Sequence, residues 1–221
     1  MEKIGAFILY TGQPEIKIAR KSIEDQVDEV IVIDRVSPVN KAIQLCFKLG
    51  QKFDWFLIFG ADTVQHPLAI ETYLKYKDKK YWSICGRLKD YYRDDYINHF
   101  YNAEAVKDYK VSDGVNYDHE IHIDMIAKGY DKIITEQITG FHHPSWTPHD
   151  AFEKHLHSGK RYPDHLRYKF LKQIIEKCLD DPRRFNIASL MGFTIGVMQG
   201  NPRPLDGKTS KEWETFKELF K

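Results

Sequence analysis

Several features that would assign a protein quickly to a class are scarce in this sequence. The 221 residues include only three cysteines, Cys46, Cys85 and Cys178, and their wide spacing suits neither a disulfide framework nor a zinc site. We therefore expect reduced thiols and a cytoplasmic protein. No apolar run approaches the ~20 residues that a membrane-spanning helix needs. The N-terminus leads directly into a strand-like segment, so we expect no signal peptide.

Charge excess and phosphate-binding glycine motifs are also missing. Lys and Arg number 33 against 32 Asp and Glu, so the net charge of +1 favours no charged partner. The turn after the first strand-like segment holds the single Gly12, whereas a dinucleotide fold would have Gly-x-Gly-x-x-Gly and a P-loop Gly-x-x-x-x-Gly-Lys-Ser/Thr there. The glycine-rich basic loop of sugar-phosphate nucleotidyltransferases is absent too. A bound nucleotide would depend on strand-end side chains and a metal.

The first half of the chain alternates strand-like apolar runs with helix-like periodicity. The sequence predicts strands over residues 4–10, 29–33, 55–59 and 82–85, and helices over residues 14–27, 37–49 and 67–76. Short connections between alternating elements are typical of a parallel sheet with right-handed crossovers. We therefore expect an α/β domain of the nucleotide-binding type. The pattern breaks at Leu88, and residues 89–96 are expected to form an irregular loop or a short helix.

The strand predicted from Trp55 ends at the carboxylate of Asp62, followed by Thr63. Open α/β sheets bind ligands beyond the carboxyl ends of their strands. A carboxylate there suits a hard divalent cation that also holds phosphate oxygens. The alternative is a turn carboxylate that starts the next helix, with Pro67 in its first turn.

A second informative stretch, residues 116–130, has helical spacing and stops at Gly129. Asp118 and Glu120 fall at its N-terminus, where the helix dipole favours ionised carboxylates. Such a carboxylate can act as a general base, and plain N-capping is the alternative. A strand expected over residues 132–138 then leads to His142 and His143, which are either metal ligands or solvated side chains.

The order of these motifs resembles the GT-A fold of nucleotide-sugar glycosyltransferases, and family 2 most closely, over roughly residues 4–144. Phe59-Gly60-Ala61-Asp62-Thr63 is similar to the metal-binding Asp-x-Asp segment, and Tyr117-Asp118-His119-Glu120-Ile121 is similar to the segment that carries the base. The helix ending in Lys128-Gly129-Tyr130 also fits. The resemblance implies an α/β fold with a mostly parallel sheet flanked by helices.

The resemblance also implies chemistry. It implies Mn2+ or Mg2+ at Asp62 with His142 or His143, and an inverting transfer from a nucleotide sugar, UDP-sugar in particular, with Asp118 as base and Glu120 as its competitor. The acceptor could be a glycan, a lipid head group, a protein or a nucleic acid. The nucleotide-sugar candidates are Tyr10, Thr11, Asp34, Asn40, Lys41, Ala61 and Asp62, and the acceptor candidates are Arg87, Tyr101, Asn102 and His119.

Two residues depart from the family pattern. Gly60 stands where the first aspartate of Asp-x-Asp would be, and Tyr117 replaces the acidic residue that usually precedes the base. Both Asp62 and Asp118 remain, so a glycosyltransferase is the first hypothesis. A catalytically silent GT-A-like domain that binds a nucleotide or a glycan is the alternative.

Residues 149–221 lie outside the resemblance and predict a helical extension beyond a domain of residues 1–148. Helices are expected over residues 164–179, 187–198 and 211–221, the second of them buried and containing Gly192 and Gly196. In the first, Leu166, Phe170, Ile174, Cys178 and Leu179 are expected to face inward. Residues 154–184 hold nine Lys or Arg against four Asp or Glu, which indicates either a solvated face or contact with an anionic acceptor.

Overall fold

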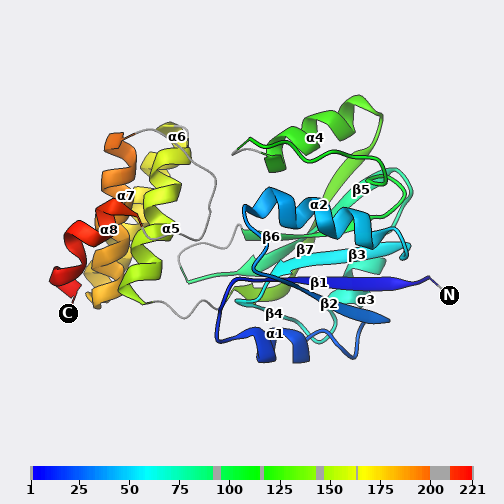
Figure 1. The fold of residues 1–221 in the computed structure, drawn as a ribbon, viewed down its shortest axis with the longest axis horizontal. Helices are drawn as coiled ribbons and strands as arrows, with labels where there is room; N and C mark the ends of the chain where they lie inside the picture. Colours follow the sequence, from blue (N-terminus) through cyan, green and yellow to red (C-terminus); the bar gives the residue numbers. More distant parts are fainter. Residues whose placement is uncertain are drawn as a thin grey trace. The chain divides into compact units, whose positions relative to one another are not determined.

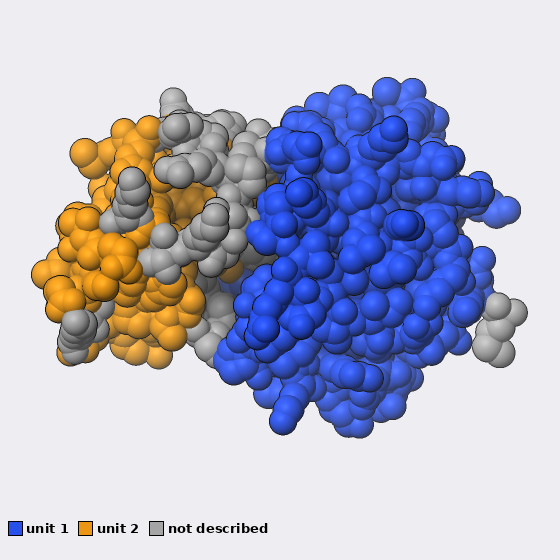
Figure 2. Space-filling view, in the orientation of Figure 1, with its two compact units in different colours: residues 1–144 blue, residues 145–221 orange. Residues whose placement is uncertain are grey.

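The computed structural model describes residues 2–91, 96–114, 117–142, 147–162, 164–199 and 210–220. It divides the chain into two compact units, residues 1–144 (unit 1) and residues 145–221 (unit 2), coloured separately in Figure 2. All three cysteines are free. Among the described helices, none combines the length and the apolar character needed to cross a membrane.

Unit 1 is built on a seven-stranded sheet in the order β2-β1-β3-β6-β5-β7-β4. The strands are β1 Ile4–Tyr10, β2 Glu29–Asp34, β3 Trp55–Gly60, β4 Thr63–Gln65, β5 Tyr81–Lys89, β6 Tyr96–Asn102 and β7 Asp131–His142. β1 is parallel to β2 and β3, and β5 is parallel to β7. β6 is antiparallel to β3 and β5, and β4 is antiparallel to β7. Five strands therefore share one direction, which confirms the predicted mostly parallel α/β sheet.

Helices cover both faces of this sheet (Figure 1). They are α1 Ile16–Lys21, α2 Val39–Gly50, α3 Ala69–Leu74 and α4 Tyr117–Ala127. α2 and α4 close one apolar layer with alternate residues of β1 and β3, and α1 and α3 close the other. In the first layer the fully buried rings of Phe7 and Phe56 meet edge to face at 5.5 Å. Each contributes about 1.5–3 kcal/mol through burial, so this layer holds β1 and β3 firmly in register.

The region after Cys85 differs from the sequence prediction. β5 continues to Lys89 and pairs with β6, which begins at Tyr96. The predicted irregular loop or short helix over residues 89–96 is therefore wrong for Lys89 and Tyr96, which both lie in strands. Beyond Cys85, the exposed Arg87 and Lys89 alternate with buried residues, which is the pattern of a strand that is half solvated. The strand β4, paired with β7, was not predicted, because three residues are too few to show a period.

Unit 2 is a helical bundle of α5 Pro148–Arg161, α6 Asp164–Asp180, α7 Arg184–Gln199 and α8 Lys211–Phe216, followed by a 3-10 turn, Lys217–Phe220. α5 and α7 pack backbone to backbone. A Cβ on Gly192 would lie 2.2 Å from the carbonyl oxygen of Phe152, and one on Gly196 equally close to that of Leu156. The glycines therefore set the spacing between these two helices.

Two predictions for α6 are wrong. Phe170 and Ile174 are buried as expected, but Leu166 is 41% and Leu179 78% exposed, because the apolar contact is confined to the middle of the helix. Part of the positive charge of this region is used internally. The guanidinium of Arg167 donates to the carbonyl oxygens of Gly159 and Lys160, which favours a structural role for that cation.

Candidate functional site

Three side chains meet where β3, β5 and β7 end. Asp62 follows the last residue of β3 by two positions, Asp90 directly follows β5, and His142 is the last residue of β7. The Nε2 atom of His142 lies 3.1 Å from Oδ2 of Asp62. Its Nδ1 atom hydrogen-bonds the carboxylate of Asp90. These three strands run in one direction, so their carboxyl ends share the edge of the sheet where α/β proteins bind ligands.

Burial differs across this group. The Asp90 side chain is 1% exposed and that of His142 8%, whereas that of Asp62 is 24% exposed. A neutral imidazole carries one N–H, so it can donate to only one of the two carboxylates. Donation from Nδ1 to Asp90 leaves the Nε2 lone pair facing Asp62. A second proton or a cation between Nε2 and Asp62 would make this juxtaposition favourable.

The residues fit a divalent metal as far as their chemistry goes. One carboxylate and one imidazole suit Mn2+. Metal-binding histidines almost always donate their other ring N–H to a carboxylate or carbonyl, and the Asp90 carboxylate lies at Nδ1 of His142, where it can accept such a bond. Within the described residues no cluster of three His, Cys, Asp or Glu is arranged to hold a metal by itself. Further ligands would have to come from the substrate or from water. The other predicted ligand, His143, lies outside the described residues.

Gly60 and Ala61 shape the turn that carries Asp62. A Cβ on Gly60 would lie 2.4 Å from Oδ1 of Asp62, so the carboxylate folds over the place where a side chain at position 60 would start. Ala61 is fully buried, and its N–H donates to the carbonyl of Leu9 at 2.9 Å. The turn is therefore fastened to β1, and Ala61 offers no side-chain contact for a nucleotide.

Asp118 and Glu120, both in the first turn of α4, face different neighbours. Burial lowers the pKa of His99, on β6, to about 4, with a further contribution from the charge of Lys132, while the charge of Asp118 acts in the opposite direction. Asp118 is therefore close to β6. Glu120 lies over Gly114, where a Cβ would be 2.8 Å from its Oε1. Asp118 is exposed, whereas Glu120 is partly buried.

The structure brings the predicted nucleotide residues Tyr10, Thr11 and Asp34 to the same edge. Tyr10 and Asp34 are register partners at the ends of β1 and β2, and Thr11 follows directly and is exposed. Asn40 is committed elsewhere, because its amide donates to the Ser112 carbonyl at 3.0 Å and thereby ties α2 to the segment before α4. Lys41, next to it, is exposed.

The four predicted acceptor residues separate into two pairs. Arg87 and His119 are exposed on β5 and α4. Tyr101 and Asn102 are register partners of Phe56 and Trp55, at the start of β3 and so at the opposite end from Asp62. The Asn102 amide donates to the Tyr81 carbonyl, so the structure does not bring this pair to the site. β6 is antiparallel, and the aromatic composition that suggested these residues carries no information about strand direction.

Asp90 was missed by sequence reasoning. It lay in the stretch expected to be irregular, and its signal was that of Asp62, a carboxylate directly after a strand. Recognising it required reading Gly86 to Lys89 as a continuation of the strand.

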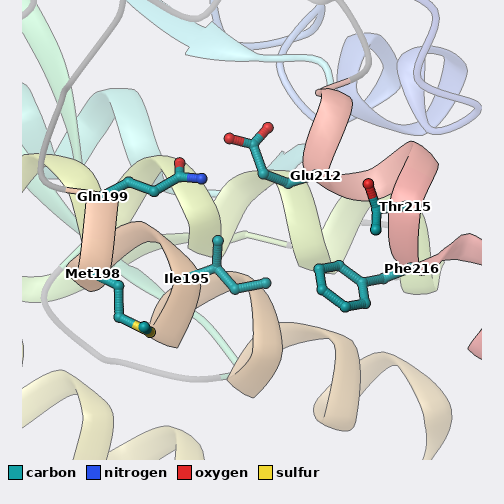
Figure 3. A pocket seen from close by; sticks show the side chains of 6 residues that line it. All are labelled: Ile195, Met198, Gln199, Glu212, Thr215 and Phe216. Atoms are coloured by element: carbon teal, nitrogen blue, oxygen red, sulfur yellow. The ribbon is translucent and has the colours of Figure 1, made fainter.

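A separate cavity of about 470 Å³ lies in unit 2 (Figure 3). Its lining residues are Ile195, Met198 and Gln199 of α7 with Glu212, Thr215 and Phe216 of α8. Glu212, its one ionisable lining group, lies 3.4 Å from the ammonium of Lys160. The cavity has no second carboxylate, imidazole or thiol with which to carry a reaction, so the strand ends of unit 1 remain the candidate site.

The strand order and the mostly parallel sheet are those of a GT-A-like α/β fold. Similar solved structures include TarS of S. aureus, at 10% identity over 80% of this chain and 43% of TarS, with a TM-score of 0.47. A glycosyltransferase involved in glycosylation of the major capsid of PBCV-1 matches at 9% identity over 63% of this chain and 93% of its own, with a TM-score of 0.44. Drosophila β-1,4-galactosyltransferase 7, solved with manganese, UDP-Gal and xylobiose, matches at 14% identity over 64% and 71%, with a TM-score of 0.45.

No family model and no curated protein sequence matches the chain. At 9–14% identity these structural likenesses concern the fold alone. The function proposed below therefore rests on the residues of the site.

Proposed function

We propose that this protein is a metal-dependent glycosyltransferase that moves a sugar from a nucleotide-diphosphate sugar, UDP-sugar in particular, to an acceptor hydroxyl with inversion. The observation that supports this most is the convergence of Asp62 and His142 at 3.1 Å, with the buried Asp90 behind the imidazole. It provides an anionic, oriented pair at the strand ends, where an α/β sheet binds a nucleotide.

Asp62 and His142 would hold Mn2+ or Mg2+, which neutralises the charge of the departing diphosphate. Asp90 keeps the proton of His142 on Nδ1, so that Nε2 stays available as a ligand. Tyr10, Thr11 and Asp34 would border the nucleotide.

Asp118 would accept the proton of the acceptor hydroxyl as its oxygen attacks the anomeric carbon. The first turn of α4 favours the ionised form that a base needs, because the unpaired N–H groups of a helix start stabilise negative charge. A single displacement inverts the configuration at that carbon. Glu120 is the competing base, although its side chain lies over Gly114.

The test is calorimetry of UDP binding with and without Mn2+. In Asp62→Ala we expect the Mn2+-dependent part of the UDP affinity to disappear. Asp78→Ala, which removes an exposed carboxylate in the turn before β5, is the control and should leave this affinity intact. Unchanged Mn2+-linked affinity in the Asp62 variant would refute the metal assignment.

Hydrolysis of UDP-sugars with Mn2+ separates the enzyme from the silent alternative. A chain that binds UDP and Mn2+ but turns over none of a panel of UDP-sugars would support a binding domain.

A further inference from the structure

One face of β5 and β7 next to the candidate site carries several exposed side chains. In a sheet, directly paired residues point to the same side, so Arg87 shares a face with its β7 partner Ile138, and Lys89 with its partner Phe141. Lower on the same strands, Cys85 pairs with Ile134 and Ser83 with Lys132. We call this surface the β5–β7 face. It carries the cations Arg87, Lys89 and Lys132, the apolar residues Ile134, Ile138 and Phe141 and, two positions from each isoleucine, the exposed carboxylate of Glu136.

The apolar part is unusually exposed for a sheet surface. Ile134, Ile138 and Phe141 are 47%, 45% and 43% exposed. α4 packs on β5, because the rings of His122 and of Trp82, on β5, are 6.3 Å apart. Ile126, one helical turn further on, is 46% exposed. Groups of exposed apolar side chains can mark interaction sites.

Arg87, Lys89 and Lys132 form no ion pair with any residue in the described ranges of the chain. Elsewhere in unit 1 several lysines do, as Lys52 does with Glu29 at 2.6 Å. The β5–β7 face therefore offers unpaired positive charge beside exposed aliphatic surface.

The face also leads into the candidate site. Lys89 directly precedes Asp90, and Phe141 directly precedes His142. Successive strand residues point to opposite sides, so the Asp90 and His142 side chains lie on the other side of the sheet, and a ligand on this face would meet the candidate site at the strand-end edge. Positive charge plus aliphatic surface suits an anionic amphiphile, since basic residues are attracted to anionic lipid and apolar side chains enter the boundary of the acyl chains.

We propose that the β5–β7 face binds the acceptor, and that the acceptor is an anionic phospholipid whose head group carries a free hydroxyl. The transfer step rests on the proposed function, whereas the lipid contact does not. In that step the head-group oxygen forms a bond to the anomeric carbon, the bond from this carbon to the diphosphate breaks, and the hydroxyl proton passes to Asp118. The nucleotide diphosphate leaves.

The experiment is vesicle flotation of the full chain without donor or metal. Three vesicle compositions are used: phosphatidylcholine alone, phosphatidylcholine with phosphatidylglycerol, and phosphatidylcholine with phosphatidic acid. We expect flotation with both anionic mixtures and none with phosphatidylcholine alone. With UDP-sugar and Mn2+ added, label should pass to phosphatidylglycerol, which has free hydroxyls, and not to phosphatidic acid.

Two variants address the two halves of the face. Arg87→Gln with Lys89→Gln should weaken partitioning about 25-fold, since each basic residue near an anionic surface is worth about fivefold. Ile134→Asn with Ile138→Asn should weaken it about tenfold or more through lost apolar contact. The matched control is Lys17→Gln with Ile18→Asn, a cation and a 60% exposed isoleucine on α1, and it should float like the parent.

No flotation with any vesicle, equal flotation with phosphatidylcholine alone, or an equal loss in the α1 control would each overturn the lipid site. Self-association of the parent without lipid, abolished by the Ile134 and Ile138 substitutions, would instead assign the face to a second copy of the chain and overturn the proposal. UDP binding with Mn2+ on the same samples keeps the two claims apart. Flotation without UDP binding refutes the proposed function, and UDP binding without flotation refutes the lipid site.

Discussion

Replacing Asp90 tests the part of the site that its sequence did not reveal. In Asp90→Asn the amide oxygen can still accept the Nδ1–H of His142, but the negative charge is lost. In Asp90→Ala both are lost, and the imidazole can place its proton on Nε2, where it blocks metal binding. We therefore expect Mn2+ affinity to fall in the order parent, asparagine variant, alanine variant.

The size of the effect follows from the geometry. Carboxylates that hold a metal-binding histidine typically contribute 10- to 100-fold in metal affinity, about 1.4–2.8 kcal/mol. With a side chain 1% exposed, Asp90 cannot be replaced by bulk water, so we expect the upper half of that range for alanine. The pair also stabilises the fold, because hydrogen bonds to charged groups contribute about 1.5–3 kcal/mol. A lower melting temperature should accompany the weaker binding.

The assay is a Mn2+ titration in the presence of UDP, followed by calorimetry, at a temperature where each variant is folded. Asp54→Asn is the matched control. The Asp54 carboxylate accepts the N–H of Lys3 at 2.7 Å at the opposite end of the sheet, so its loss affects stability without affecting the site. Unchanged Mn2+ affinity in folded Asp90→Ala, or an equal loss in Asp54→Asn, would refute the role given to Asp90.

Three further predictions concern the base, the pH dependence and unit 2. Asp118→Asn should cost transfer about 10²–10⁴-fold with donor binding intact, and Glu120→Gln should cost far less. The lowered pKa of His99 means that the unfolded chain binds more protons between pH 6.5 and about 4. Stability is therefore full above pH 6.5 and declines by about 3 kcal/mol as pH falls through this window, a slope that urea unfolding should find reduced in His99→Leu. Gly192→Ala should destabilise unit 2 by about 1–3 kcal/mol in thermal unfolding, because its Cβ would collide with the Phe152 backbone.

Each of these three predictions would be contradicted by a specific result. Full transfer in Asp118→Asn with an inactive Glu120→Gln would move the base to Glu120. A pH slope unchanged in His99→Leu would mean that other groups carry the acid sensitivity. Thr194→Ala, on the exposed side of α7, is the control for the glycine, and equal stability of the two variants would show that α5 and α7 separate without cost.

The sequence alone predicts the parts of the fold that follow from the periodic spacing of apolar residues. Trp55 to Phe59 is buried along its whole length, and such a run has few other structures available to it. The same holds for β1 and for the helix that carries Asp118. The position of Asp62 at the end of β3 then follows from chain order alone.

Strand direction and long-range pairing could not be predicted in this way. The reversal of β6 removed Tyr101 and Asn102 from the site, and local composition is the same for either direction. The contact of His142 with Asp90 joins residues 52 positions apart and depends on β5 and β7 being neighbours, which sheet order decides. Asn40 likewise looked available, until packing placed its amide against Ser112.

Gly60 is the departure that bears most on the proposed function. An Asp-x-Asp segment supplies two carboxylates from one turn. Here the turn supplies one, from Asp62, while the second belongs to Asp90 and acts through the His142 imidazole. The space at position 60 is taken by the Asp62 carboxylate itself, since a Cβ there would be 2.4 Å from Oδ1. A side chain at position 60 would therefore require the Asp62 carboxylate to move, whereas glycine leaves room for the carboxylate in the position from which it reaches His142.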